Sequence, residues 1–499
     1  MNFSRVAKSC VLFAVIFSVS VQAQAADWKF HVSFPKSVHA KPYTGRVYVI
    51  FSQQKQEPRL GPSWFRPEKF IAQEVNNLKP GEELVISSSQ TKGLLSYPKP
   101  LDELDVTNHY AQAVIRFNPH ARQIGKGPGN GFSDAIVIRG QGSPAASFVV
   151  NKLVPKPNFR ETDWTKLFRF RSKMLSEFHG RDVYMQAAVL LPRSYFQQTK
   201  RRFPTVFNIP GFSGRHFDAI EDTPTNEDND ESVEFLRVTL DPDCPLGHHV
   251  FADSENNGPV GAALIKEFLP AFDRSFRSIP KPSARFLTGH SSGGWSSLWL
   301  QVTYPEHFGG VWSTAPDPVD FRDFQRINLY KSNENMYVDT NGKDRPLARI
   351  NGNVVLWYRG FSMMEWTLGY GGQLHSFEAV FSPRGKNGKP KLIWDRQTGK
   401  VDNIVTKHWE KYDIRLILER NWETLGPKLQ GKINVIMGDR DTFYLEGATI
   451  LLKESLAKLG SDAVVEIVPG RDHFNLYKGG LYDRIRREMV AAFLKKHKD

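Results

Sequence analysis

The sequence predicts two structural units: an N-terminal β-sandwich, then an α/β unit whose mostly parallel sheet carries helices on both faces. The first observation behind this is that residues 27–151 contain short apolar or alternating runs separated by Pro, Gly and Asn, with no convincing helix. The second is that strand-like runs alternate with helical apolar spacing after about residue 165. With 499 residues, 40% of them hydrophobic, the chain can bury a core in each unit.

The first residues have the pattern of a secretory signal peptide. Arg5 and Lys8 precede an apolar run over 11–21, and Ala23 and Ala25 form an A-x-A cleavage site. We therefore expect residues 1–25 to be removed and the protein to be exported, either periplasmic or secreted. The run is too short to anchor the chain in a bilayer, and no later run is longer, so we expect no stable membrane anchor.

The N-terminal unit is expected to be an immunoglobulin-like sandwich over residues 27–151. The runs that predict its strands are "WKFHVSF", "GRVYVIFS", "EELVISS", "YAQAVIRF" and "DAIVIRG". A linker over 152–164 follows, with prolines at positions 155 and 157. The α/β unit is then expected over 165–499.

The α/β unit shows strands and helices in turn. Its strands are expected at 183–192, 203–211, 233–241, 285–288, 432–441 and 463–473, and a further strand with its exit loop at 309–320. Helices are expected at 259–276, from Gly294 to about residue 305, at 446–460 and near the C-terminus. An aromatic-rich segment over 321–428 interrupts this alternation, so we expect it to be an insertion or cap. Trp357 and Trp366 within it are candidates for binding substrate.

The stretch "FLTGHSSGGW" (286–295) predicts a nucleophilic serine at Ser291. A G-x-S-x-G pattern alone is weak evidence, but here it follows a strand and opens a helix, as a nucleophile elbow requires. Such an elbow holds the serine in an unfavourable backbone conformation, and the residues two before and two after it must be small. Gly289 and Gly293 occupy these positions.

A serine nucleophile needs a base, and a base needs an acid to orient it. In this architecture both follow the serine, at the ends of later strands. His473 is the expected base. Asp441 is the preferred acid because it lies further out on its loop than Asp439, and Asp317 is a lesser candidate after an earlier strand.

The oxyanion hole needs two N–H donors. The backbone N–H of Ser292 follows the nucleophile, and the loop "FNIPGFSG" offers the N–H of Phe212 as the second donor.

Several other residues are expected to be structural. His290 lies beside the nucleophile, the pair in "GHHV" (247–250) lacks a third metal ligand, and Cys244 has no partner for a disulfide after export. The net charge of +13 is dispersed and accompanies no nucleic-acid-binding motif. We expect no metal, no cofactor and no nucleic-acid partner.

The motif "GHSSGGW", the helix "ENNGPVGAALIKEFLPAFDRSFR" before it and the Asp and His loops after it resemble the putative-esterase (esterase D-like) family of α/β hydrolases. That group includes feruloyl, acetyl-xylan and enterochelin esterases and mycolyltransferases. The resemblance runs from about residue 165 to the end, apart from 321–428. It implies the α/β-hydrolase fold, with Ser291, Asp441 and His473 as the catalytic residues.

The leading hypothesis is therefore an exported serine esterase that acts on a small-molecule or glycan-linked ester. An acyltransferase with the same triad is the first alternative, and a non-catalytic carbohydrate-binding protein is the second. The sequence leaves the acyl group, the alcohol and the oligomeric state open.

Overall fold

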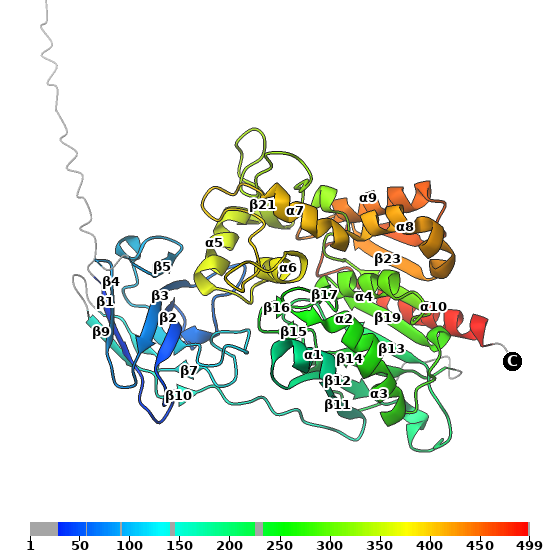
Figure 1. Cartoon of the computed structure of the whole chain (residues 1–499), viewed down its shortest axis with the longest axis horizontal. Coiled ribbons are helices and arrows are strands. Elements are labelled where there is room, and N and C mark those ends of the chain that lie inside the picture. The colour runs from blue at the N-terminus through cyan, green and yellow to red at the C-terminus, as the bar shows by residue number, and fades with distance from the viewer. Residues whose placement is uncertain (1–27, 56, 90–91, 140–144, 225–232, 498–499) are drawn as a thin grey trace, which may run out of the picture.

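The computed structural model describes residues 28–55, 57–89, 92–139, 145–224 and 233–497. The signal-peptide prediction lies outside these residues. The N-terminal unit and the α/β unit lie side by side, and the insertion lies above the junction between them (Figure 1). No helix within the described ranges is both long and apolar enough to cross a membrane.

Two sheets form the N-terminal unit. The smaller has the order β4-β1-β9, built from β4 (Leu84–Ser87), β1 (Lys29–Ser33) and β9 (Ala145–Val149). The larger has the order β10-β7-β6-β2-β3-β5, with β8 also paired to β6. Its strands are β10 (Lys152–Leu153), β7 (Gly131–Phe132), β6 (Tyr110–Ile115), β2 (Tyr43–Ser52), β3 (Lys69–Leu78), β5 (Leu94–Tyr97) and β8 (Ile136–Val137).

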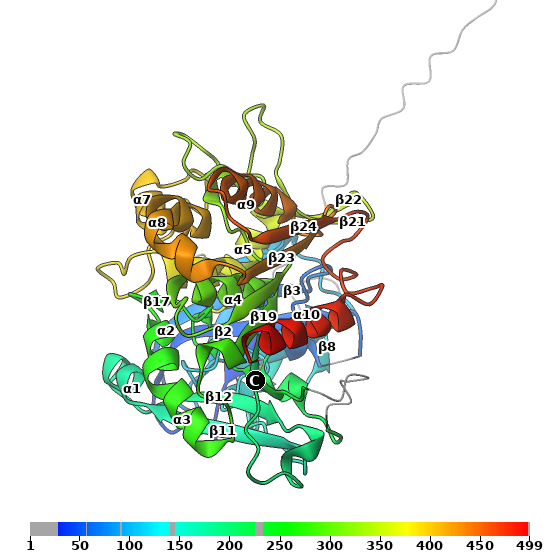
Figure 2. The same ribbon diagram turned by 90° about the vertical axis from the view of Figure 1, so that its right-hand side faces the viewer.

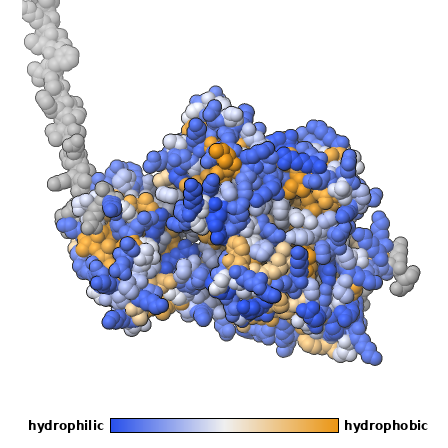
Figure 3. Space-filling view, in the orientation of Figure 1, coloured by the Kyte–Doolittle hydropathy of each residue, from blue (hydrophilic) through white to orange (hydrophobic). Residues whose placement is uncertain are grey.

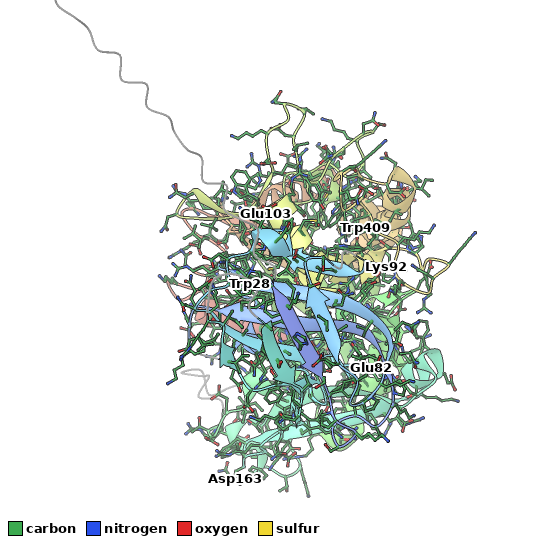
Figure 4. The ribbon with its side chains drawn as sticks, turned by 90° about the vertical axis from the view of Figure 1, so that its left-hand side faces the viewer. Trp28, Glu82, Lys92, Glu103, Asp163 and Trp409 are labelled. Atoms are coloured by element: carbon green, nitrogen blue, oxygen red, sulfur yellow. The ribbon has the colours of Figure 1, made fainter. Side chains whose placement is uncertain are left out.

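The larger sheet is buried on both of its faces. Along β2, Val47, Val49 and Phe51 face the small sheet and share its core with Phe30 of β1. The alternate residues Tyr48 and Ile50 belong instead to the main core of the α/β unit. Figure 4 looks onto this sandwich, with Trp28 beside its strands and Trp409 of the insertion above them. The N-terminal unit is therefore packed into the rest of the protein.

An eight-stranded sheet with the order β11-β12-β14-β13-β19-β20-β23-β24 forms the α/β unit. Its strands are β11 (Thr165–Ser172), β12 (Val183–Leu190), β14 (Leu236–Leu240), β13 (Thr205–Ile209), β19 (Arg285–His290), β20 (Gly310–Thr314), β23 (Ile433–Gly438) and β24 (Val464–Val468). β12 is antiparallel to both neighbours, and the strands from β14 to β24 are parallel.

Helices cover both faces of this sheet, which confirms the predicted fold class. One face packs on α10 (Leu481–Lys496), shown in red in Figure 2. The other packs on α2 (Val260–Ala263), α3 (Leu269–Ser275), α4 (Ser292–Thr303), α8 (Ile414–Leu429) and α9 (Glu446–Lys458). A π-helical turn over Leu264–Phe268 joins α2 and α3, so the single helix expected over 259–276 is one rod with a bulge.

The insertion leaves the sheet after β20 and returns to it at β23. It contains β21 (Pro346–Ile350), β22 (Asn353–Trp357), α5 (Tyr358–Leu368), α6 (Gln373–Phe381) and α7 (Asn403–Trp409), and it ends with α8. α8 packs against α4 and α9, so the last part of the segment belongs to the body of the fold. The visible surface is mostly hydrophilic with separate hydrophobic patches (Figure 3).

Candidate active site

Ser291 lies at the sharp turn between β19 and α4. Its backbone has φ 60° and ψ −127°, a conformation that costs free energy for a residue with a side chain. The turn is tight because strand and helix pass close together. A Cβ on Gly293 would lie 1.9 Å from the carbonyl oxygen of Ile209, and one on Gly289 would lie 2.2 Å from that of Gly293. Both glycines are therefore needed sterically, as the elbow pattern predicted.

The predicted base and acid form a buried pair. Nδ1 of His473 lies 2.7 Å from Oδ2 of Asp441, and both side chains are almost fully buried. The other carboxylate oxygen of Asp441 accepts the N–H of Phe443 at 2.8 Å. Asp439 instead accepts the N–H of Gly470 at 2.7 Å in an exposed position. Asp441 is thus the carboxylate that meets the histidine.

The electrostatics of this pair favour a protonated histidine. Burial by itself lowers the pKa of His473, but the negative charge of Asp441 and the hydrogen bond to it outweigh burial and raise the pKa. Asp317 adds to this effect through its charge. The arrangement therefore stabilises the imidazolium that forms when a histidine takes a proton from a nucleophile.

Asp317 lies under the first turn of α4. Its Oδ2 accepts the hydroxyl of Ser292 at 2.6 Å and the side-chain N–H of Gln373 at 3.3 Å. Burial raises the pKa of this carboxyl group to about 6. Its hydrogen bonds fix the first residue of the helix, whose backbone N–H is one of the two predicted oxyanion donors.

The loop that carries Phe212 is held from below by His248. Nε2 of His248 lies 2.9 Å from the carbonyl oxygen of Pro210. Because Nδ1 of the same ring accepts the N–H of Val250 at 3.1 Å, the proton lies on Nε2 and is donated to Pro210. Burial lowers the pKa of His248 to about 3, so the ring stays neutral. This histidine, predicted to be a loop residue without metal, therefore supports the loop that carries the predicted oxyanion donor Phe212.

The N-terminal unit holds the same loop from above. The ring of Trp64 stacks on Phe212, with centroids 5.5 Å apart, and meets Phe361 of α5 edge-on at 5.3 Å. The guanidinium of Arg122 lies 4.7 Å from the centre of the Phe212 ring and pairs with Asp243 at 2.6 Å. Residues of three parts of the chain therefore fix the predicted second oxyanion donor.

Ser291, His473, Asp317 and Phe212 all line one cavity of about 700 Å³. Its other walls include the N-terminal loop that contains Trp64 and Phe65, a second N-terminal loop over 122–126, the insertion and the loop after β23. Trp357 and Trp366, expected to bind substrate, are not among its lining residues. Trp357 is 43% exposed, and the backbone of Trp366 accepts a hydrogen bond from Arg46.

Sequence reasoning missed Trp64 and Phe65. The signal available was the stretch "GPSWFRP" (61–67), which places two large aromatic residues between prolines, where no strand can bury them. Aromatic residues in a loop need another surface to cover them, and here that surface is the active-site cavity.

The other singled-out residues have structural surroundings. His290 lies 3.2 Å from Oγ1 of Thr314, and burial lowers its pKa to about 3. Cys244 is a free thiol whose pKa burial raises to about 12. Among the described residues, no group of three or more His, Cys, Asp or Glu side chains is arranged to hold a metal ion.

The sequence of the chain matches a known protein family. The model of the family described as putative esterase matches residues 180–446, a range that includes Ser291 and Asp441. No curated protein matches the chain.

Solved structures similar to the chain include three esterases or serine hydrolases. An S-formylglutathione hydrolase from Agrobacterium tumefaciens is 14% identical, with 66% of this chain and 95% of that chain covered and a TM-score of 0.40. Fluorophosphonate-binding serine hydrolase F of Staphylococcus aureus is 13% identical, with 66% and 98% covered and a TM-score of 0.39. A ferulic acid esterase from Anaeromyces mucronatus is 15% identical, with 66% and 91% covered and a TM-score of 0.36.

The family match spans more than half of the 499 residues. The protein therefore belongs to the putative esterase family and is a carboxylic ester hydrolase.

Proposed function

We propose that the protein is exported and cleaves its ester through an acyl-enzyme formed on Ser291, with His473 as the base and Asp441 as the orienting acid. The observation that carries this proposal is the 2.7 Å contact between Nδ1 of His473 and Oδ2 of Asp441, with His473 and Ser291 lining the same cavity. The positive φ of Ser291 supports it, because such strain is characteristic of a nucleophile elbow.

The reaction follows from the positions of these groups. Oγ of Ser291 attacks the ester carbonyl while Nε2 of His473 takes its proton, and Asp441 stabilises the resulting imidazolium through Nδ1. The carbonyl oxygen becomes negative and accepts hydrogen bonds from the backbone N–H groups of Phe212 and Ser292. The latter lies at the N-terminus of α4, where the helix dipole also favours negative charge.

The tetrahedral intermediate then loses the alcohol, which leaves with the proton that His473 returns. Water attacks the acyl-enzyme in the same way, with His473 again as base, and the acid product is released. The substrate we propose is a small-molecule or glycan-linked ester. The cavity of about 700 Å³ is large enough for an organic acyl or alcohol group.

A labelling experiment tests the nucleophile. Mature wild-type protein, Ser291→Ala and Ser292→Ala are incubated with a fluorophosphonate probe and assayed with p-nitrophenyl acetate. We expect label and turnover in wild type, and neither in Ser291→Ala. Ser292→Ala should still be labelled, because the role proposed for Ser292 uses its backbone N–H. Label on Ser292, or turnover by Ser291→Ala, would refute the assignment.

The same assay distinguishes the alternatives. Added methanol or glycerol that diverts product from acid to ester would indicate an acyltransferase. Wild type that neither labels nor turns over would favour a binding protein.

Export is tested separately. Expressed with its full N-terminus in a bacterial host, the protein should appear outside the cytoplasm with a mature sequence that begins at Ala26. A cytoplasmic product that retains residues 1–25 would refute export.

A further inference from the structure

A second cavity lies at the junction of the N-terminal unit, the linker and the α/β unit. Its volume is about 960 Å³, and its lining contains neither Ser291 nor His473. Residues 155–157 of the linker, the N-terminal loop around residues 118–128, and β11, β12 and α1 (Lys173–His179) contribute to its walls. Arg122, Gln123 and Lys126 line both this cavity and the catalytic one, so a single loop separates the two.

The acidic residues deep in this second cavity are already neutralised. Arg215 holds Asp241 through two hydrogen bonds of 2.6 and 3.1 Å, and Arg122 pairs with Asp243 at 2.6 Å. The positive charge and hydrogen bonds of Arg215, together with His216, keep the pKa of Asp241 below its usual value despite burial. These four side chains contribute no net charge to the cavity.

Further cations on the walls have no such partner. Within the described part of the chain, four lining cations form no ion pair with a carboxylate: Lys126, Lys156, Arg169 and Arg181. The one other lining carboxylate, Asp182, already pairs with Arg171 at 2.7 Å. The cavity therefore carries an excess of positive charge that attracts anions.

Neighbouring groups are consistent with this field. Burial lowers the pKa of His120 and His179, and the positive charge of Arg181 lowers both further. One buried hydrogen-bond donor is also unpaired: Nδ2 of Asn257, a lining residue more than nine-tenths buried, has no partner. An unpaired buried donor at a cavity wall is expected to be satisfied by an acceptor, either an anion or water.

We propose that this second cavity, the basic cavity, binds a chain that carries several carboxylate or phosphate groups, and that this chain is the anionic part of the ester substrate. Its size exceeds that of an inorganic ion and fits several linked units. Arg122, Gln123 and Lys126 line both cavities, so a chain bound in the basic cavity borders the loop that also walls the cavity of Ser291. Assignment of the chain to the substrate rests on the proposed function, whereas binding of the chain does not.

Binding is therefore tested without turnover. Trigalacturonate, sodium tripolyphosphate and xylotriose, which represent carboxylates, phosphates and an uncharged chain, are titrated into the Ser291→Ala protein by calorimetry. The same titrations are made with Arg169→Gln/Arg181→Gln added, and with Lys453→Gln as the charge control. Arg169 and Arg181 line only the basic cavity, and Lys453 lies on α9, on another part of the molecule (Figure 1).

We expect one of the two anions to bind, xylotriose not to bind, and the double substitution to weaken binding by about tenfold or more, since each partly exposed charge contributes up to about fivefold. Raising the salt concentration should weaken binding in parallel. The anion that binds more tightly identifies the chemistry of the chain. Binding no stronger than that of xylotriose, or binding unchanged by the double substitution, would overturn the proposal.

A separate kinetic experiment tests whether the chain bound in the basic cavity is part of the ester substrate. Wild type and Arg169→Gln/Arg181→Gln are compared on p-nitrophenyl acetate and on acetylated trigalacturonate or a phosphate-bearing acetyl ester, according to the anion that binds. We expect an unchanged rate on p-nitrophenyl acetate and a raised KM on the anionic ester. An unchanged KM on the anionic ester would separate the basic cavity from the substrate. If the wild-type protein hydrolysed neither p-nitrophenyl acetate nor the anionic ester, the proposed function would be refuted, and the result on anion binding would still hold.

Discussion

The substitution Asp441→Asn tests the site most sharply, because the hydrogen bonds of this side chain dictate its effect. One carboxylate oxygen accepts the N–H of Phe443, and the other meets Nδ1 of His473. In the asparagine the carbonyl oxygen must keep the contact with Phe443, since an amide N–H there would face another donor. The amide N–H therefore points at Nδ1 of His473 and forces that nitrogen to be an acceptor.

The proton of His473 then lies on Nε2, the nitrogen proposed to accept the proton of Ser291, which can no longer do so. A base locked in the wrong tautomer is expected to lower kcat by about 10³- to 10⁴-fold, or about 4–5.5 kcal/mol of transition-state stabilisation. A second effect concerns pH. The charge of Asp441 is the main influence that raises the pKa of His473, so its loss lowers that pKa. Residual activity, which requires a neutral histidine, should therefore persist to lower pH than in wild type.

The assay is kcat and kcat/KM for p-nitrophenyl acetate from pH 4 to 9, with Asp439→Asn as the matched control. Among the described residues the carboxylate of Asp439 accepts one hydrogen bond, from the N–H of Gly470, which an asparagine carbonyl can also accept, so we expect activity within about twofold of wild type. The reasoning would be wrong if Asp441→Asn kept more than a tenth of the activity, or if Asp439→Asn lost as much as Asp441→Asn.

Three further substitutions test neighbouring parts of the site. Gly293→Ala should destabilise the fold by about 3 kcal/mol or more in urea unfolding because its Cβ would meet backbone, whereas Gly360→Ala, which meets nothing within 4 Å, should stabilise it by about 0.5–1 kcal/mol; equal effects would contradict the steric argument. Trp64→Ala should lower kcat by about tenfold or more by releasing the loop that carries the proposed oxyanion donor Phe212, while Trp357→Ala should have little effect; equal kinetics would count against a role for the N-terminal unit. Asp317→Asn removes a charge that raises the pKa of His473, so the acid limb of the pH–rate profile should move to lower pH, and an unmoved limb would contradict this coupling.

The nucleophile elbow and the residues at the strand ends could be predicted from short stretches of the sequence. The positions of Gly289 and Gly293 could be predicted because their spacing reflects a close contact between a strand and the helix that follows it. The positions of Asp441 and His473 could be predicted because neighbouring parallel strands end at the same edge of a sheet. The choice of Asp441 over Asp439 came from its place on the loop, and the geometry agrees with that choice.

The parts that escaped prediction depend on contacts between distant segments. β3 was missed because Phe70, Ile71 and Ala72 are all buried, which removes the alternation expected of a sheet with one solvated face. β11 was missed because it is the edge strand of the eight-stranded sheet, where the burial of its residues is irregular. Trp64 was missed because its partners lie about 150 and 300 residues further along the chain, in Phe212 and Phe361. Aromatic density pointed to the insertion but could not indicate which of its rings face the cavity.

Because the large N-terminal sheet is buried on both of its faces, the enzyme cannot easily be truncated or fused to another domain. A catalytic fragment cut at the linker would lose the apolar side chains of Tyr48, Ile50 and Phe70 from its core and the ring of Trp64 from its site. The matching surface left on the fragment would then be open to water and prone to aggregate. Replacing the N-terminal unit with an unrelated domain would leave the same apolar surface uncovered. The two units should therefore be expressed and engineered together, with the residues on both sides of the shared core changed in concert.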